Sequence, residues 1–88
     1  MIDRSLMVLL MSVLREQRDL SCGTEENTLF DELNLRSTQT VTTSLLREHI
    51  GKAQDKGWVE TFTGSLEERR IRITPAGCGA LNDLKHGG

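Results

Sequence analysis

The sequence predicts a mainly α-helical α+β fold: three helices, then a two-stranded β hairpin, then a short final helix. Three observations predict it. Apolar residues recur at helical spacing up to Gly57, the pattern then changes to the alternation of β-strands, and Thr74-Pro75 is a strong signal for a new helix. A chain of 88 residues is long enough for one domain. We expect that domain to cover residues 1–86, with residues 87–88 as a flexible tail.

The first helix is expected over residues 3–18, where Asp3 can cap the N-terminus. Met7 and Met11 make its apolar face wider than one core contact needs, and burial on all sides is difficult in so short a chain. We therefore expect Met7, Met11 and Leu14 to form a dimer interface with the same strip of a second copy. The alternative is that the final helix covers this strip within one chain. The residues that fall on one broad helical stripe are Ile2, Leu6, Leu9, Leu10, Val13 and Leu14. Leu6, Leu10, Val13 and nearby residues are expected to face inward.

The second helix is expected to begin at Thr24, with Glu25 and Glu26 near its positively polarised N-terminus. Asn34 is a suitable residue to end it. The segment Arg36–Thr42 is rich in hydroxyl-bearing and β-branched residues, so we expect it to form the turn to the third helix. The inward side chains of the second helix are expected to be Leu29, Phe30 and Leu33.

The third helix is expected to be capped by Thr42 or Thr43 and to run through Lys56. Gly57 ends it, because glycine accepts the left-handed backbone conformation at no steric cost. Its inward face is predicted to consist of Leu46, Ile50 and Ala53.

After Gly57, residues 58–63 and 70–74 alternate as two strands, with a turn at Gly64-Ser65. The alternation places Ile71 and Ile73 on one face. The final helix begins at Pro75, and its glycines make it weak in isolation. The predicted order of elements is that of a winged helix-turn-helix domain: helix, helix, turn, helix, hairpin and helix.

The charge balance is slightly acidic, with 11 Lys and Arg against 13 Asp and Glu and a pI near 5.6. This argues against a strongly basic, non-specific nucleic-acid binder. For DNA binding, however, the local distribution of charge matters more than the net charge. The acidic residues gather over residues 25–32, whereas Arg69, Arg70 and Arg72 lie together in the hairpin.

Nothing in the sequence indicates a metal, a cofactor or an enzyme. His49 and His86 lie at no ligand-like spacing from a cysteine, and no phosphate-binding glycine loop or nucleophile motif occurs. Cys22 and Cys78 are expected to be free thiols of a cytoplasmic protein, with a disulfide between them as the alternative. The apolar run over residues 6–11 is too short to cross a bilayer.

Three short sequence motifs in the second half of the chain carry a resemblance to a known protein family. They are DKGWVE (55–60), EERRIRIT (67–74) and ITPAG (73–77). Because of these motifs, the segment over residues 41–84 resembles the winged-helix transcriptional regulators of the MarR and PadR type. The resemblance implies that the third helix enters the major groove of DNA and that the hairpin, or wing, touches the backbone. The chain lacks the long additional helices with which MarR proteins dimerise.

On this resemblance Arg47 is expected to bind guanine, and Glu48 to accept a hydrogen bond from cytosine. The arginines of the wing are expected to contact phosphate. The alternative is a solvated helix face, and a wing whose arginines pair with Glu60, Glu67 or Glu68. The full set of expected DNA-binding residues is Arg36, Thr43, Ser44, Arg47, Glu48, Lys52, Arg69, Arg70 and Arg72.

We therefore expect a sequence-specific DNA-binding transcriptional regulator that acts as a homodimer on double-stranded DNA. The alternative is a winged helix used as a protein–protein interaction module, which the acidic second helix favours. The sequence identifies no effector ligand.

Overall fold

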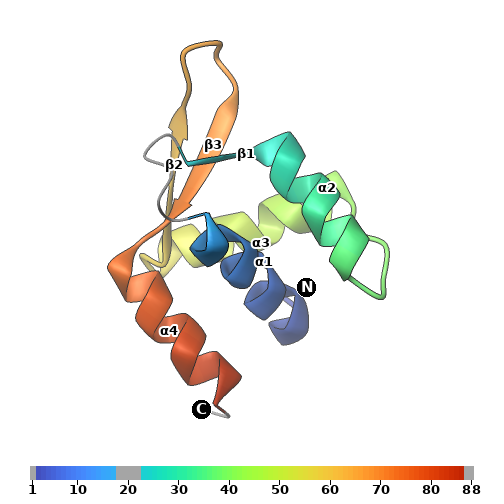
Figure 1. Cartoon of the computed structure of the whole chain (residues 1–88), viewed down its shortest axis with the longest axis vertical. Helices are drawn as coiled ribbons and strands as arrows, with labels where there is room; N and C mark the ends of the chain where they lie inside the picture. Colours follow the sequence, from blue (N-terminus) through green and yellow to red (C-terminus); the bar gives the residue numbers. More distant parts are fainter. Residues whose placement is uncertain (1, 18–22, 87–88) are drawn as a thin grey trace.

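The computed structural model describes residues 2–17 and 23–86. These residues form α1 (Arg4–Glu16), β1 (Thr24–Glu25), α2 (Glu26–Arg36), α3 (Thr43–Asp55), β2 (Val59–Thr63), β3 (Arg69–Ile73) and α4 (Pro75–Lys85). The strands make an antiparallel sheet in the order β1-β3-β2. The β2–β3 hairpin projects from one end of the helical body, and α4 lies at the other (Figure 1). The predicted α+β fold, mainly helical with a wing, is confirmed.

α1 is the central helix of the core. The carboxylate of Asp3 caps it as expected, since Oδ1 accepts hydrogen bonds from the amides of Ser5 (2.8 Å) and Leu6 (3.3 Å). α2, β3 and α4 all pack against it. Because three elements surround α1, more of its faces are buried than a surface helix would bury. Its buried side chains are Leu6, Met7, Leu10, Met11, Val13 and Leu14.

The expectation that Met7, Met11 and Leu14 form an exposed dimer interface is wrong. Their exposed fractions in the single chain are 3%, 0% and 2%. α4 packs along α1, and the Arg15 guanidinium donates to the Asn82 side chain at 3.0 Å across the two helices. The alternative weighed for this strip, cover by the final helix of the same chain, agrees with the structure.

The segment before α2 is a strand and does not begin the helix. Thr24 pairs with Ile71 and Glu25 with Arg70, so the sheet has a third strand beside the predicted hairpin. The expectation that Thr24 starts the second helix is therefore wrong. A buried, β-branched threonine suits a pleated strand, and α2 begins at Glu26 without a side-chain cap.

The turn between α2 and α3 is held by a side chain. Asn34 was expected to end the second helix, but α2 continues to Arg36. The Asn34 amide accepts from the Val41 backbone N–H at 2.9 Å and donates to its carbonyl at 3.1 Å. Thr42 then caps α3 by accepting from the Leu45 amide at 3.1 Å. One of the two expected caps of the third helix is therefore confirmed.

Gly57 ends the α3 segment with φ +76°, as expected. Beyond it, the wing turn is longer than the predicted Gly64-Ser65. The last strand pair is Thr63 with Arg69, and the turn covers residues 64–68. The Gly64 amide donates to the Glu68 carbonyl at 2.8 Å to close it.

Thr74 joins the sheet to α4. Its hydroxyl accepts from the Gly77 amide at 3.0 Å, as a helix cap, and donates to the Gly57 carbonyl at 2.6 Å. Gly77 lies directly against the Trp58 backbone, where a Cβ would come within 2.1 Å of the carbonyl oxygen. This glycine therefore permits the close approach of α4 to the start of the wing.

Cys22 and the expected tail at residues 87–88 lie outside the described residues. Cys78 is a free, half-buried cysteine. Within residues 2–17 and 23–86, three or more His, Cys, Asp and Glu side chains nowhere gather as a metal site would need. No helix in those ranges has the length and apolar character needed to cross a membrane.

Candidate nucleic-acid interface

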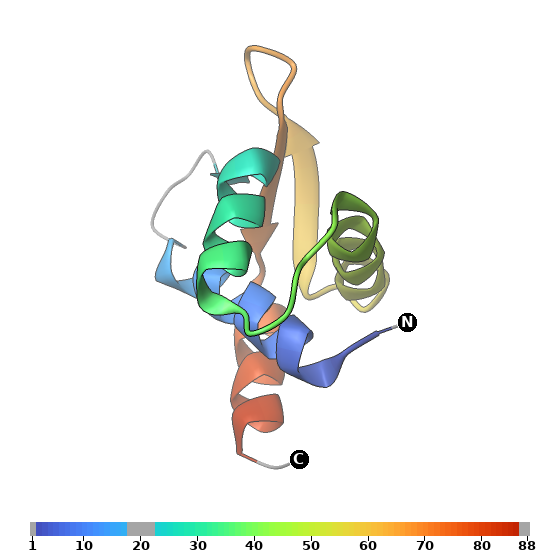
Figure 2. The ribbon, with the colours of Figure 1, turned by 90° about the vertical axis from the view of Figure 1, so that its right-hand side faces the viewer.

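α3 is a two-sided helix at the edge of the molecule, next to β2 (Figure 2). Its inward side chains are buried: Leu46, Ile50 and Ala53, as expected, and also His49. Five of the residues expected to bind DNA lie on its exposed side: Thr43, Ser44, Arg47, Glu48 and Lys52. α3 therefore has an exposed polar face.

His49 fixes α3 against the start of α1. The ring is fully buried. Its Nε2 accepts from the backbone N–H of Asp3 at 2.9 Å, so Nδ1 carries the proton and donates to the Leu45 carbonyl at 2.8 Å. The side chain is thus fully hydrogen-bonded and holds the exposed face in a fixed orientation.

The most notable feature of the site is a carboxylate shared by two arginines. Nε of Arg47, from α3, lies 3.2 Å from Oε1 of Glu26, and Nε of Arg69, from β3, lies 3.4 Å from Oε2. The arginine side chains are 60% and 46% exposed, whereas that of Glu26 is only 12% exposed. α3 and the wing therefore meet at one acidic residue of α2.

The path of the chain explains how Glu26 reaches this position. Glu25 pairs with Arg70 in the sheet, so the next residue lies near Arg69 of the same strand. Glu26 is also the first residue of α2, where the helix dipole favours a negative charge. The sequence placed Glu26 in an acidic segment near the N-terminus of the second helix but gave it no role in the site. The signal that could have located it is the extended Thr24-Glu25 pair, which the sequence analysis assigned to a helix.

Arg70 and Arg72 lie on the opposite face of the sheet from Ile71 and Ile73, as the alternation predicted. Nε of Arg70 donates to Glu68 at 3.0 Å, and Nε of Arg72 donates to Glu60 at 2.6 Å. The alternative weighed for the wing, pairing with its own glutamates, therefore describes both side chains. Among the three wing arginines, it is Arg69 that shares a partner with α3.

Three hydrogen-bond donors of the wing stabilise the Glu68 carboxylate. Its own backbone amide, followed by the Arg70 guanidinium, lowers the pKa of the Glu68 carboxyl. The carboxylate also accepts from the Leu66 amide at 3.0 Å. These contacts hold the turn and leave the Arg70 guanidinium occupied.

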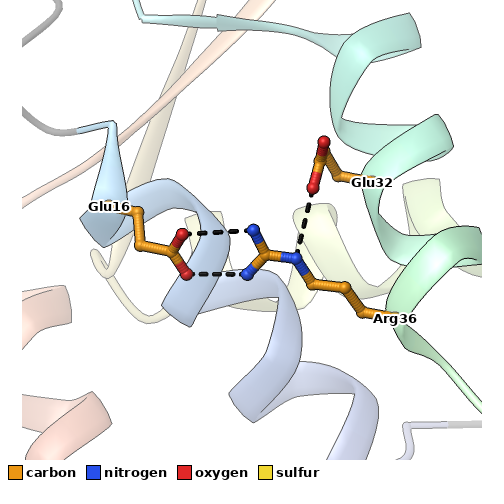
Figure 3. A network of polar contacts seen from close by, with 3 residues as sticks. All are labelled: Glu16, Glu32 and Arg36. Atoms are coloured by element: carbon orange, nitrogen blue, oxygen red, sulfur yellow. Dashed lines mark hydrogen bonds and ion pairs between the residues drawn. The ribbon is translucent and has the colours of Figure 1, made fainter.

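Arg36 connects α1 and α2 (Figure 3). Its Nη1 and Nη2 donate to the two carboxylate oxygens of Glu16 at 2.7 and 3.1 Å, and its Nε donates to Glu32 at 3.2 Å. The Glu16 hydrogen bonds raise the pKa of Arg36, and Arg36 in turn lowers the pKa of Glu16. Arg36, one of the residues expected to bind DNA, thus joins α1 to α2 in this structure.

Trp58 and Lys56 follow the exposed face of α3. Trp58 is half-buried against the core. The Lys56 ammonium lies 5.4 Å from the centroid of its ring, within the range of a cation–π contact.

Comparison with known proteins bears on the fold. No protein-family model and no curated protein sequence matches this chain. Among solved structures, "F93 from STIV, a winged-helix DNA-binding protein" is similar, with a TM-score of 0.78 at 15% sequence identity. The similarity covers 98% of this chain and 89% of the other. The chain therefore has the winged-helix fold.

Proposed function

We propose that this protein is a DNA-binding transcriptional regulator, with α3 in the major groove and the wing against the backbone. The observation that carries the proposal is the convergence of Arg47 and Arg69, which places cations of the helix and of the wing at one exposed surface. The description of F93 as DNA-binding, at the same fold, supports it. The MarR and PadR resemblance of Val41–Leu84 supports the regulatory role, and the protein would act in the cytoplasm by binding and not by catalysis.

Each exposed residue of α3 has a role in this proposal. Arg47 suits a bidentate contact with guanine, and Glu48 can accept from the amino group of cytosine. The hydroxyls of Thr43 and Ser44, at the N-terminus of α3, suit phosphate contacts that fix the register. Lys52 would add a phosphate contact in the last turn.

A homodimer on a palindromic site remains part of the proposal, but it needs a surface other than the buried Met7, Met11 and Leu14. Light scattering on the free protein and on its DNA complex tests it. One chain per duplex would show that the protein binds as a monomer.

The second candidate function is a protein–protein interaction module. It is favoured by two apolar side chains that are at least four-fifths exposed: Leu35 at the end of α2, at 80%, and Leu66 in the wing turn, at 87%. The glutamates that pair with the wing arginines also favour it. In that case the arginine pairs would stabilise the wing alone.

Fluorescence anisotropy with a labelled random duplex of about 20 base pairs, from about 50 to 200 mM salt, separates the two functions. A DNA binder loses affinity with a log–log slope of about 0.9 for each phosphate contact. Arg69→Ala should reduce that slope by about 0.9, because Arg69 lies beside α3. Arg72→Ala is the matched control, since its guanidinium pairs with Glu60 on the other sheet face. Absence of binding at the lowest salt would refute the proposed function.

A further inference from the structure

The geometry points to Glu26 as a residue that determines specificity in the proposed DNA interface. This inference rests on the proposed function. We infer that Glu26 orients Arg47 and Arg69 and, by its charge, opposes their contact with phosphate. It would thereby weaken non-specific binding to DNA more than specific binding.

The contacts of Glu26 involve one particular nitrogen of each arginine. Both arginines meet it through Nε. In the described part of the chain, no other contact is seen for the terminal nitrogens of Arg47 and Arg69. Those terminal nitrogens are therefore available to a ligand. Glu26 holds the Arg47 guanidinium by a hydrogen bond and attracts that of Arg69 by charge.

Glu26 is fixed by the fold. It follows directly from β1 and opens α2, and its side chain is only 12% exposed. Its Oε2 atom is buried and receives no hydrogen bond from the described residues. An approaching DNA strand can move the exposed arginines, but it cannot expel the carboxylate without disturbing the junction of β1 and α2.

Phosphate groups and bases differ in what they require of the two arginines. The three side chains carry a net charge of +1, where two arginines alone would carry +2. Phosphate is an anion, and its binding depends on charge. The O6 and N7 atoms of guanine are neutral acceptors, and their binding depends on the placing of a guanidinium. A fixed carboxylate therefore opposes phosphate contact while it improves the geometry for guanine.

The test compares Glu26→Gln with Glu32→Gln in the full-length protein. Glu32 lies on the same helix and pairs with Arg36, so the control removes the same charge from α2 beside a different arginine. The probes are a random duplex and a duplex enriched from a random library by the wild-type protein. Urea unfolding of both variants accompanies the titrations, so that loss of fold is recognised.

For Glu26→Gln we expect affinity for random DNA at about 50 mM salt to rise at least about threefold, because the negative charge beside Arg47 and Arg69 is removed. The salt slope should steepen by up to about 0.9, and the preference for the enriched duplex should fall. Glu32→Gln should keep the wild-type affinity for random DNA, the wild-type salt slope and the wild-type preference for the enriched duplex. In an Arg47→Ala/Arg69→Ala background, Glu26→Gln should have no effect on binding.

Equal salt slopes and equal preference in the two glutamine variants would overturn the inference while leaving DNA binding intact. If the wild type binds no DNA, the proposed function itself fails. If Glu26→Gln does not fold, the arginine Nε–H signals of the wild-type protein decide by NMR. Signals of Arg47 and Arg69 that shift on addition of the enriched duplex support the inference, and signals that stay unchanged overturn it.

Discussion

Gly51 lies in the middle of α3, next to the residues proposed to bind DNA. A Cβ added at this position meets no atom within 4 Å. Glycine inside a helix costs about 0.5–1 kcal/mol relative to alanine, because it loses more backbone freedom on folding. Gly51→Ala should therefore stabilise the free protein by about 0.5–1 kcal/mol, which for a domain of this size raises Tm by about 2–8 °C.

The same methyl group should have the opposite effect on the complex. A helix seated in the major groove brings its exposed face into close contact with the DNA, and a glycine there lets the backbone approach most closely. An added methyl group at a tight contact costs about 1–3 kcal/mol. We therefore expect Gly51→Ala to weaken DNA binding by about that amount although the protein is more stable.

Gly79→Ala is the matched control. Gly79 is also inside a helix, α4, and a Cβ there also meets no atom within 4 Å. It should stabilise the fold equally and leave DNA affinity unchanged. Thermal unfolding followed by Trp58 fluorescence and anisotropy titration measure the two effects. Equal affinity of both variants for DNA would refute the placement of this face in the groove. Loss of stability in Gly51→Ala would contradict the absence of neighbouring atoms around a Cβ at this position.

Three further predictions concern the fold. Gly77→Ala should destabilise by about 1–3 kcal/mol despite the better helix propensity of alanine, because its Cβ would lie 2.1 Å from the Trp58 carbonyl oxygen; urea unfolding measures it. Thr74→Val should cost about 1 kcal/mol through loss of the α4 cap in the same assay. The Glu16 pKa is lowered by Arg36, so this contact stabilises the protein above the ordinary pKa near 4.5 and is lost as pH falls further. Arg36→Met should therefore unfold with a weaker dependence on acid pH, and an unchanged pH profile would contradict this assignment.

Periodicity predicted the helices and the wing because those elements are set by local chemistry. The Asp3, Thr42 and Thr74 caps and the Gly57 terminator lie where the sequence indicated them. The interpretation of α1 failed for a reason that is not local. Whether Met7 and Met11 are exposed depends on where α4 packs, and the residues of α1 alone do not contain that information.

The candidate site was partly predictable in the same sense. Helical periodicity placed Arg47 on the exposed face of α3, and strand alternation placed Arg70 and Arg72 opposite Ile71. The role of Glu26 depends on a pairing between β1 and β3, whose residues are far apart in sequence. Only the tertiary structure brings Glu26 to Arg69.

The central claim is that α3 and the adjacent wing form one nucleic-acid surface, and chemical-shift mapping tests it most directly. ¹⁵N-labelled protein would be titrated with the enriched duplex at about 50 mM salt, where electrostatic contacts are strong. We expect the largest amide and arginine side-chain shifts on residues 43–52 and on Arg69, with small shifts over α4. Shifts concentrated on α4, or none at saturating DNA, would contradict it.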